Sequence, residues 1–129
     1  MEQTVSEAVE ARLTDERTVA HLATCVDDRP HVAPLWFRYE EGTVEILTTG
    51  QKLANLRRNP KVALSVARDD EGLPDWKVTV LGTATVVEDE AETKAANRRL
   101  NRKYGVDDDS WQENTLVRID VGSVASKSW

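Results

Sequence analysis

The sequence predicts a mainly β protein with antiparallel strands, arranged as a small barrel, and three observations support this fold class. Six short runs rich in β-branched and other apolar residues recur along the chain, and tight turns join most of them. Parallel strands need long crossover connections, so this order of elements argues against a doubly wound sheet. The chain has 129 residues, the usual size of one folding unit, and we expect a single domain over residues 1–129.

The first half of the chain is expected to hold one helix and three strands. Apolar residues recur at helical spacing over residues 5–13, which predicts an amphipathic helix there. β-Prone runs follow, separated by turn-forming stretches rich in Asp, Glu, Gly and Pro, and short turns of this kind connect antiparallel neighbours. These three strands are expected over residues 18–25, 31–39 and 43–48.

The second half is expected to add two helices and three strands. Residues 51–58 have the composition of a short helix that Asn59 and Pro60 end, because the residue before a proline avoids the helical region. A longer helix is expected to begin after Asp89, a residue type that caps helix N-termini, and to stop at Gly105. The remaining strands are expected over residues 61–68, 76–87 and 114–121, which brings the predicted total to six.

Composition and charge argue against several kinds of partner and site. The net charge of −6 leaves no excess of cations for phosphate backbones, so we expect no nucleic-acid partner. No apolar run approaches the length of a membrane span, and the first residues lack the pattern of a secretory signal. We therefore expect a cytoplasmic protein without a membrane partner. One cysteine cannot form an internal disulfide, and His21 and His31 lack a third ligand nearby, so we expect no metal site.

The stretch from Thr48 to Lys52 opens the short predicted helix and is the strongest candidate for a ligand site. The first turn of a helix presents unpaired N–H groups and partial positive charge, so a lysine there is unfavourable unless an anion is bound. The hydroxyls of Thr48 and Thr49, with Gly50 allowing close backbone approach, would complete a phosphate-binding cradle. A lysine exposed on a surface turn is the alternative, which the spacing alone leaves open.

Trp36 and Phe37 are a second candidate. Neighbouring strand positions face opposite sides of a sheet, so only one of these side chains can lie in a one-sided core. The other would cover a sheet edge, a subunit partner or a flat ligand. Plain core packing is the alternative interpretation. No serine-hydrolase motif or catalytic-triad spacing is present, and the sequence identifies no catalytic residue.

Several segments together resemble a known superfamily in their order and spacing. They cover residues 19–24, 29–37, 47–49, 52–62 and 78–84. The sequence thus resembles the split-barrel flavoproteins of the pyridoxamine 5′-phosphate oxidase-like superfamily, in particular its short members. The resemblance implies a six-stranded antiparallel split β-barrel of the FMN-binding type, with flanking helices. It also implies a homodimer that holds one flavin mononucleotide (FMN) in each of two grooves between subunits.

The resemblance also assigns site residues by position. Those expected to border the isoalloxazine ring of FMN are Ala33, Pro34, Leu35, Trp36 and Phe37. Those expected to hold its 5′-phosphate are Thr48, Thr49 and Lys52, which is the site that the helix argument reached independently. Lys77, on the more polar face of the longest predicted strand, is expected to face the ring.

The implied function is that of an FMN-binding oxidoreductase acting with a small-molecule substrate or electron donor. Enzymes that oxidise pyridoxamine phosphate carry basic C-terminal residues for the phosphate of their substrate, whereas residues 122–129 offer only Lys127. We therefore do not expect oxidation of that vitamin phosphate. A reductase that uses the deazaflavin coenzyme F-420 is an alternative on the same fold, because both cofactors share the ribityl-phosphate end. A non-catalytic flavin- or haem-binding module is the other alternative.

Overall fold

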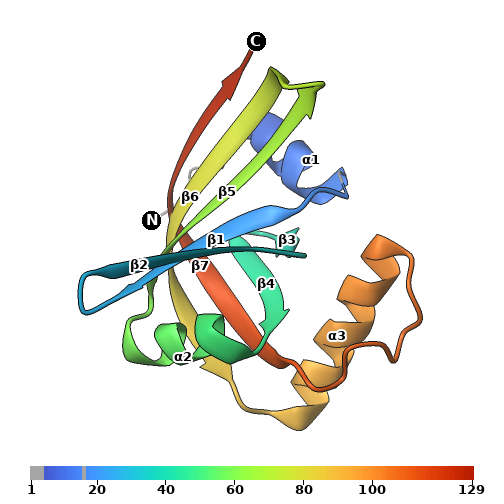
Figure 1. Cartoon of the computed structure of the whole chain (residues 1–129). Helices are drawn as coiled ribbons and strands as arrows, with labels where there is room; N and C mark the ends of the chain where they lie inside the picture. The colour runs from blue at the N-terminus through green and yellow to red at the C-terminus, as the bar shows by residue number, and fades with distance from the viewer. Residues whose placement is uncertain (1–4, 16) are drawn as a thin grey trace.

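The computed structural model describes residues 5–15 and 17–129 (Figure 1). Within these residues the helices are α1 (Glu7–Asp15), α2 (Gly50–Arg58) and α3 (Glu90–Tyr104). The strands are β1 (Ala20–Val26), β2 (Arg29–Leu35), β3 (Arg38–Glu40), β4 (Thr43–Thr48), β5 (Lys61–Asp70), β6 (Leu73–Val87) and β7 (Thr115–Ser128). None of the described helices is long and apolar enough to cross a membrane.

The seven described strands form one antiparallel sheet in the order β2-β1-β5-β6-β7-β4-β3. Strands β2 and β3 are consecutive in the chain, yet they lie at opposite ends of this order. Only Trp36 and Phe37 separate them, and such a connection spans at most about 11 Å. The sheet must therefore curl until its two edges come near each other. No ladder joins β2 to β3, so the curled sheet stays open along this line.

The predicted mainly β, antiparallel class is confirmed, but the predicted count of six strands was wrong. The run expected over residues 31–39 is divided into β2 and β3, because Trp36 and Phe37 leave the ladder. The Phe37 ring is fully buried in the core, and Trp36 stacks on Tyr104 of α3. The last strand also continues beyond residue 121 to Ser128, since residues 121–128 pair with the first half of β6.

The hydrophobic core fills the inside of the curled sheet, and a second, smaller cluster lies outside it. The inner core includes Phe37, Ile46 and Ile119. Helix α3 packs on the outer face of β4 and β7, where Leu47 and Leu116 form part of the outer cluster. Strand β4 is therefore buried on both faces, and α3 lies beside the connection between β2 and β3 (Figure 1).

The predicted boundaries of α3 are confirmed by its two caps. The Asp89 side chain accepts a hydrogen bond from the Glu92 amide at 2.9 Å, and Gly105 ends the helix in the left-handed region at φ 74°. Helix α2 packs against β1 and β6 at one end of the sheet, and α1 packs against β3. Both ends of β2 are thus flanked by a helix, α2 near its start and α3 near its end (Figure 1).

Candidate functional site

The first turn of α2 carries a lysine that has no counter-ion within the described part of the chain. Thr49 is the N-cap residue, but its side chain makes no capping hydrogen bond, and the first turn contains no acidic residue. Gly50 adopts φ +72°, a conformation that favours glycine. Lys52 is half-buried and makes no ion pair or hydrogen bond with any described residue. The helix end therefore combines partial positive charge with an unpaired ammonium group.

The two threonines before α2 differ in their availability to a ligand. Thr48 is buried at the end of β4, opposite Thr115 of β7, and its hydroxyl lies 3.5 Å from the Thr49 carbonyl oxygen. Thr49 is exposed beside the first turn of α2. Of the two predicted hydroxyl ligands, Thr49 is the one that an incoming anion can reach directly.

A cavity of about 590 Å³ lies between this helix and the start of β2, and we call it the α2 cavity. The His31 Nδ1 atom is buried and has no hydrogen-bond partner within the described residues. A buried polar atom without a partner is uncommon, and it often marks a site that a ligand or water completes. The lining residues of the α2 cavity are Val26, Asp27, Arg29, Pro30, His31, Gln51, Asn55 and Arg58.

The inner wall of the α2 cavity is fixed by a chain of hydrogen bonds. The Gln51 side chain donates to Asn55 Oδ1 at 2.7 Å, and the Asn55 side chain donates to Thr24 Oγ1 at 3.0 Å. At the rim, Arg58 pairs with Asp27 at 3.2 Å, while Arg29 has no ion pair among the described residues. The cavity therefore offers an unpaired guanidinium and an unsatisfied imidazole nitrogen on a rigid frame, which suits a phosphate.

The other end of β2 opens into a smaller cavity of about 340 Å³, which we call the aromatic groove. Trp36 forms one wall, and its ring stacks on Tyr104 with 4.4 Å between centroids and 2° between planes. The neighbouring Phe37 is in the core, so only one of the two consecutive aromatic residues faces a cavity. The groove is lined by Pro34, Leu35, Trp36, Leu47, Asn97, Leu100, Trp111 and Asn114.

The end of α3 holds the connection between β2 and β3 in place. Lys103 Nζ donates to the Phe37 carbonyl oxygen at 2.8 Å and lies 4.0 Å from the centroid of the Phe37 ring. Burial, together with the positive charge of Arg38, lowers the pKa of Lys103 to about 8. The Tyr104 hydroxyl donates to the Thr18 carbonyl oxygen at 2.6 Å, and burial raises the pKa of this hydroxyl. These contacts fix the position of the Trp36 ring.

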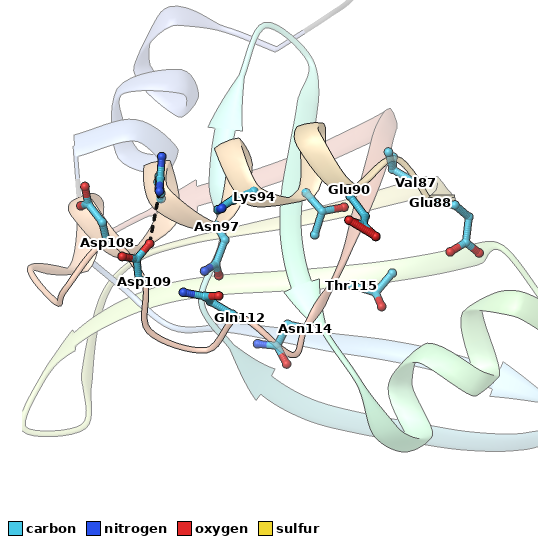
Figure 2. A pocket seen from close by; sticks show the side chains of 12 residues that line it. Val87, Glu88, Glu90, Lys94, Asn97, Asp108, Asp109, Gln112, Asn114 and Thr115 are labelled. Carbon is cyan, nitrogen blue, oxygen red and sulfur yellow. Dashed lines mark hydrogen bonds and ion pairs between the residues drawn. The ribbon is translucent and has the colours of Figure 1, made fainter.

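A third cavity, of about 440 Å³, continues from the aromatic groove along α3 (Figure 2). Asn97 and Asn114 line both cavities, so the two are contiguous. Figure 2 shows Asn97, Gln112 and Asn114 gathered below α3, with an ion pair between Arg98 and Asp109 at its rim at 3.4 Å. This third cavity is polar and carries charges of both signs.

Strand β2 connects the α2 cavity to the aromatic groove. From His31 to Trp36 the chain advances five residues, about 17 Å in an extended strand. Ala33, Pro34 and Leu35 lie between these points, on a strand whose outer edge pairs with no other described strand. The arrangement is an elongated site with a cationic end, an open sheet edge and an uncharged aromatic end.

The predicted site residues lie in three places: along β2, at the start of α2, and, for Lys77, farther along the sheet; Thr48, Thr49 and Lys52 line neither the α2 cavity nor the aromatic groove. Residues 33–36 and Thr48, Thr49 and Lys52 all lie along β2 or at the start of α2. Lys77 pairs with Ala67 and Lys127 in the part of the sheet that projects away from α2 (Figure 1). The described residues bring no three His, Cys, Asp or Glu side chains into a cluster able to hold a metal ion.

Sequence reasoning missed several residues of the site. Arg29 and His31 face the α2 cavity because of how β2 pairs with β1, which the sequence does not reveal, and Gln51 faces it from the first turn of α2. Trp111 and Asn114 reach the aromatic groove through the loop after α3, which has no strand or helix periodicity. The signal that could have marked His31 was its position in the alternating pattern of an edge strand beside the candidate helix.

The open antiparallel sheet with its elongated edge site defines a split-barrel class of protein. The family model described as pyridoxamine 5′-phosphate oxidase matches residues 6–128, and the chain belongs to this family. The resemblance inferred from the sequence is thereby confirmed. None of the curated proteins matches this sequence.

Solved structures share the fold over nearly the whole chain. An F420 reductase is 25% identical with a TM-score of 0.73, and the match covers 89% of this chain and 94% of that one. A conserved hypothetical protein from Mycobacterium tuberculosis is 25% identical with a TM-score of 0.78, covering 97% and 86% of the two chains. A FAD-binding protein from Mesorhizobium loti is 22% identical with a TM-score of 0.75, covering 96% and 95%, and shows the shared fold.

Proposed function

We propose that this protein is a flavin-dependent oxidoreductase that binds FMN along β2, with the phosphate beside α2 and the ring beside residues 33–36. The observation that carries the proposal is the combination of the orphaned His31 nitrogen near the start of β2 and the Trp36 wall immediately after its end. The separation of about 17 Å suits a phosphorylated chain with a flat ring at its end. The unpaired Lys52 next to Gln51 supplies the charge that a phosphate requires.

Each part of the chain would have a distinct task in this function. The cofactor, when bound, supplies hydride or electron transfer, and the protein supplies binding and electrostatics. Arg29, His31 and Gln51, which line the α2 cavity, would hold the phosphate, with Lys52 and Thr49 approaching it from the adjacent first turn of α2, outside the cavity lining. Trp36, fixed from behind by Tyr104, would cover the ring against water. No side chain at this site is required to act as an acid or a nucleophile.

A deazaflavin-dependent reductase is the second candidate, favoured by the similarity to an F420 reductase at 25% identity. Both cofactors carry a ribityl phosphate, so the α2 cavity would serve either. Isothermal titration of the apoprotein with FMN and with coenzyme F-420 separates the two, and the absorption spectrum of the purified protein identifies a retained cofactor. Bleaching by NADH or NADPH, followed by reoxidation with an acceptor, would distinguish an enzyme from a binding module for flavin or haem.

Replacing Lys52 by alanine is expected to weaken FMN binding by about 1–3 kcal/mol, the range for a lost charge-assisted hydrogen bond. The dissociation constant should rise between about 5-fold and 150-fold at this range. Isothermal titration of the folded variant measures the change. Lys61→Ala is the matched control, because Lys61 is an exposed lysine at the start of β5. Equal FMN affinities for Lys52→Ala and the unaltered protein would refute the phosphate contact.

The site is expected to be completed by a second copy of the chain. The edge of β2 leaves a bound ring exposed on one side, and Lys77 is too far along the sheet to approach it within one chain (Figure 1). We propose a homodimer in which the partner covers the ring and brings its own copy of this lysine. Light scattering of the FMN-bound protein should give the mass of two chains. The mass of one chain in that state would contradict the shared site.

A further inference from the structure

We propose that the aromatic groove binds the substrate, and that this substrate is an uncharged, planar aromatic molecule with a hydrogen-bonding group. The proposal rests on the proposed function, because Pro34, Leu35 and Trp36 line the groove and are also the residues beside which the cofactor ring would lie, so the substrate would share this wall with the ring. None of the eight residues that line the groove carries a formal charge. A phosphate or carboxylate buried there would lose its hydration without gaining a counter-ion. A volume of about 340 Å³ suits one or two fused rings.

Trp111 is held at the groove in a conformation that its own packing does not explain. Its backbone has φ 59°, in the left-handed region that bulky residues rarely adopt, and its side chain is 56% exposed. A strained residue persists only where its surroundings fix it, and such residues concentrate at ligand sites. Because Trp111 contributes nothing to either core cluster, contact with a ligand is the role that its position supports.

The loop that carries Trp111 is fixed to α3 immediately before it. Asn97 donates to the Ser110 carbonyl oxygen at 2.8 Å, and Asn101 donates to the carbonyl oxygens of Ser110 and Asp108, both at 2.9 Å. The two donor side chains, Asn97 and Asn101, are buried, so the bonds are partly shielded from water. The loop therefore presents the indole from a rigid base, which lowers the entropic cost of binding.

The second tryptophan of the lining, Trp36, is also held in place. The ring of Trp36 is backed by Tyr104, whose hydroxyl is bound to the Thr18 carbonyl oxygen. Two tryptophans thus line the groove, and indole rings favour flat aromatic ligands through stacking and buried area. Aliphatic side chains, Leu47 and Leu100 among them, complete the apolar lining.

Asn114 supplies a polar group for the ligand. Its side-chain amide is half-buried and makes no hydrogen bond to any described residue. Asn114 lies where the aromatic groove meets the polar cavity along α3. A ring carbonyl, hydroxyl or amide on the substrate would pair with it, and any polar extension would enter the third cavity, along α3.

Two probes of equal shape test this assignment, 2-naphthamide and 2-naphthoate at neutral pH. Ligand-observed NMR titration of the apoprotein should show that the neutral amide binds at least tenfold more tightly than the carboxylate. Trp111→Ala should weaken binding of the amide at least tenfold, whereas Trp111→Phe should stay within about threefold. Asn114→Leu should weaken it about fivefold. Leu73→Ala is the control for loss of an exposed apolar side chain, since Leu73 begins β6 at the other end of the sheet (Figure 1).

Equal binding of the two probes, or an unchanged amide affinity in Trp111→Ala, would overturn the proposal. Titration of the same variants with FMN separates this proposal from the proposed function. If Trp111→Ala keeps FMN affinity within twofold and loses the amide, the groove is the substrate site. If it loses FMN affinity tenfold, the groove belongs to the cofactor and the substrate assignment fails. If the unaltered protein binds neither FMN nor coenzyme F-420, the proposed function fails, whereas the probe titration still decides whether the groove binds neutral aromatics.

Discussion

Replacing Glu45 by glutamine is expected to lower the free energy of unfolding by about 3 kcal/mol, near the lower end of the range for a broken buried ion pair. Glu45 lies on β4 beneath α3 and is 7% exposed. Its carboxylate receives hydrogen bonds from Arg38 and Arg118, both at 3.1 Å, and from Arg99 at 3.2 Å. Glutamine is neutral and leaves three guanidinium groups around a site without an anion. The arginines keep some contact with water, which places the expected loss at the lower end.

Glu45 should also make the free energy of unfolding depend on pH in the acidic range. Burial raises the pKa of Glu45, but the hydrogen bonds of Arg118 and Arg99 and the charge of Arg38 outweigh it, so the net pKa is lowered. The unfolded chain then takes up a proton at a higher pH than the folded chain does. The contribution of Glu45 is therefore complete above the ordinary glutamate pKa, near 4.5, and is lost as the pH falls below that value.

Urea denaturation at pH 7 and at steps between pH 5 and pH 3 measures both effects. Glu45→Gln should lose stability at pH 7 and show a flatter decline toward acid than the unaltered protein. Glu40→Gln is the matched control, because Glu40 pairs with the same Arg38 but its side chain is 61% exposed. This control should change the free energy of unfolding by less than about 1 kcal/mol. Equal losses for the two variants would show that the buried cluster is no stronger than a surface ion pair.

Phe37→Ala is expected to lower the free energy of unfolding by about 3–5 kcal/mol, the range for a large aromatic side chain removed from a core. Phe37 has no exposed surface and closes the core at the line where the sheet is open. Trp36→Ala removes a larger side chain, yet it should cost only about 1–2 kcal/mol. That residue is half-buried, and its main described partner is the Tyr104 ring.

Urea denaturation of the two variants measures this difference in stability. FMN titration at low temperature should rank the two variants in the opposite order by their loss of FMN affinity. Trp36→Ala should weaken cofactor binding, whereas folded Phe37→Ala should retain it, because the Phe37 side chain reaches neither cavity. A larger stability loss in Trp36→Ala than in Phe37→Ala would mean that the two aromatic residues have exchanged the roles assigned to them.

The elements that sequence reasoning located correctly are those whose causes are local. Asp89 and Gly105 delimit α3 because a cap and a left-handed glycine act within one turn of the helix. The division of residues 31–39 into two strands was not predictable in this way. It depends on Tyr104, which is 67 residues beyond Phe37 and bonds to its backbone. When a strand ends because of a contact with a distant residue, the sequence of the strand itself does not indicate where it ends.

The same distinction between local signals and distant contacts applies to the residues of the candidate site. Lys52 and residues 33–36 could be predicted as site residues because a helix start, a pair of aromatic residues and a family pattern all consist of consecutive residues. His31 and Trp111 were missed, since one depends on strand register and the other on a loop held by Asn97 and Asn101. Lys77 was assigned to the ring from the family resemblance, and its relation to the site depends on the proposed homodimer.

Strand β2 has a consequence for how copies of the protein can meet. It is an outermost strand, and Pro30 and Pro34 both stand within its ladder to β1. A proline within a ladder has its nitrogen on the outer edge, where no hydrogen bond to the neighbouring strand is needed. Between the two prolines, Val32 is therefore the only residue whose N–H can bond to an added strand at this edge. Because this edge offers only one N–H donor, another strand cannot extend the sheet here. The edge is thereby protected from edge-to-edge aggregation of chains. The backbone carbonyl oxygens on this edge of β2 remain available to accept hydrogen bonds from small molecules that carry donor groups.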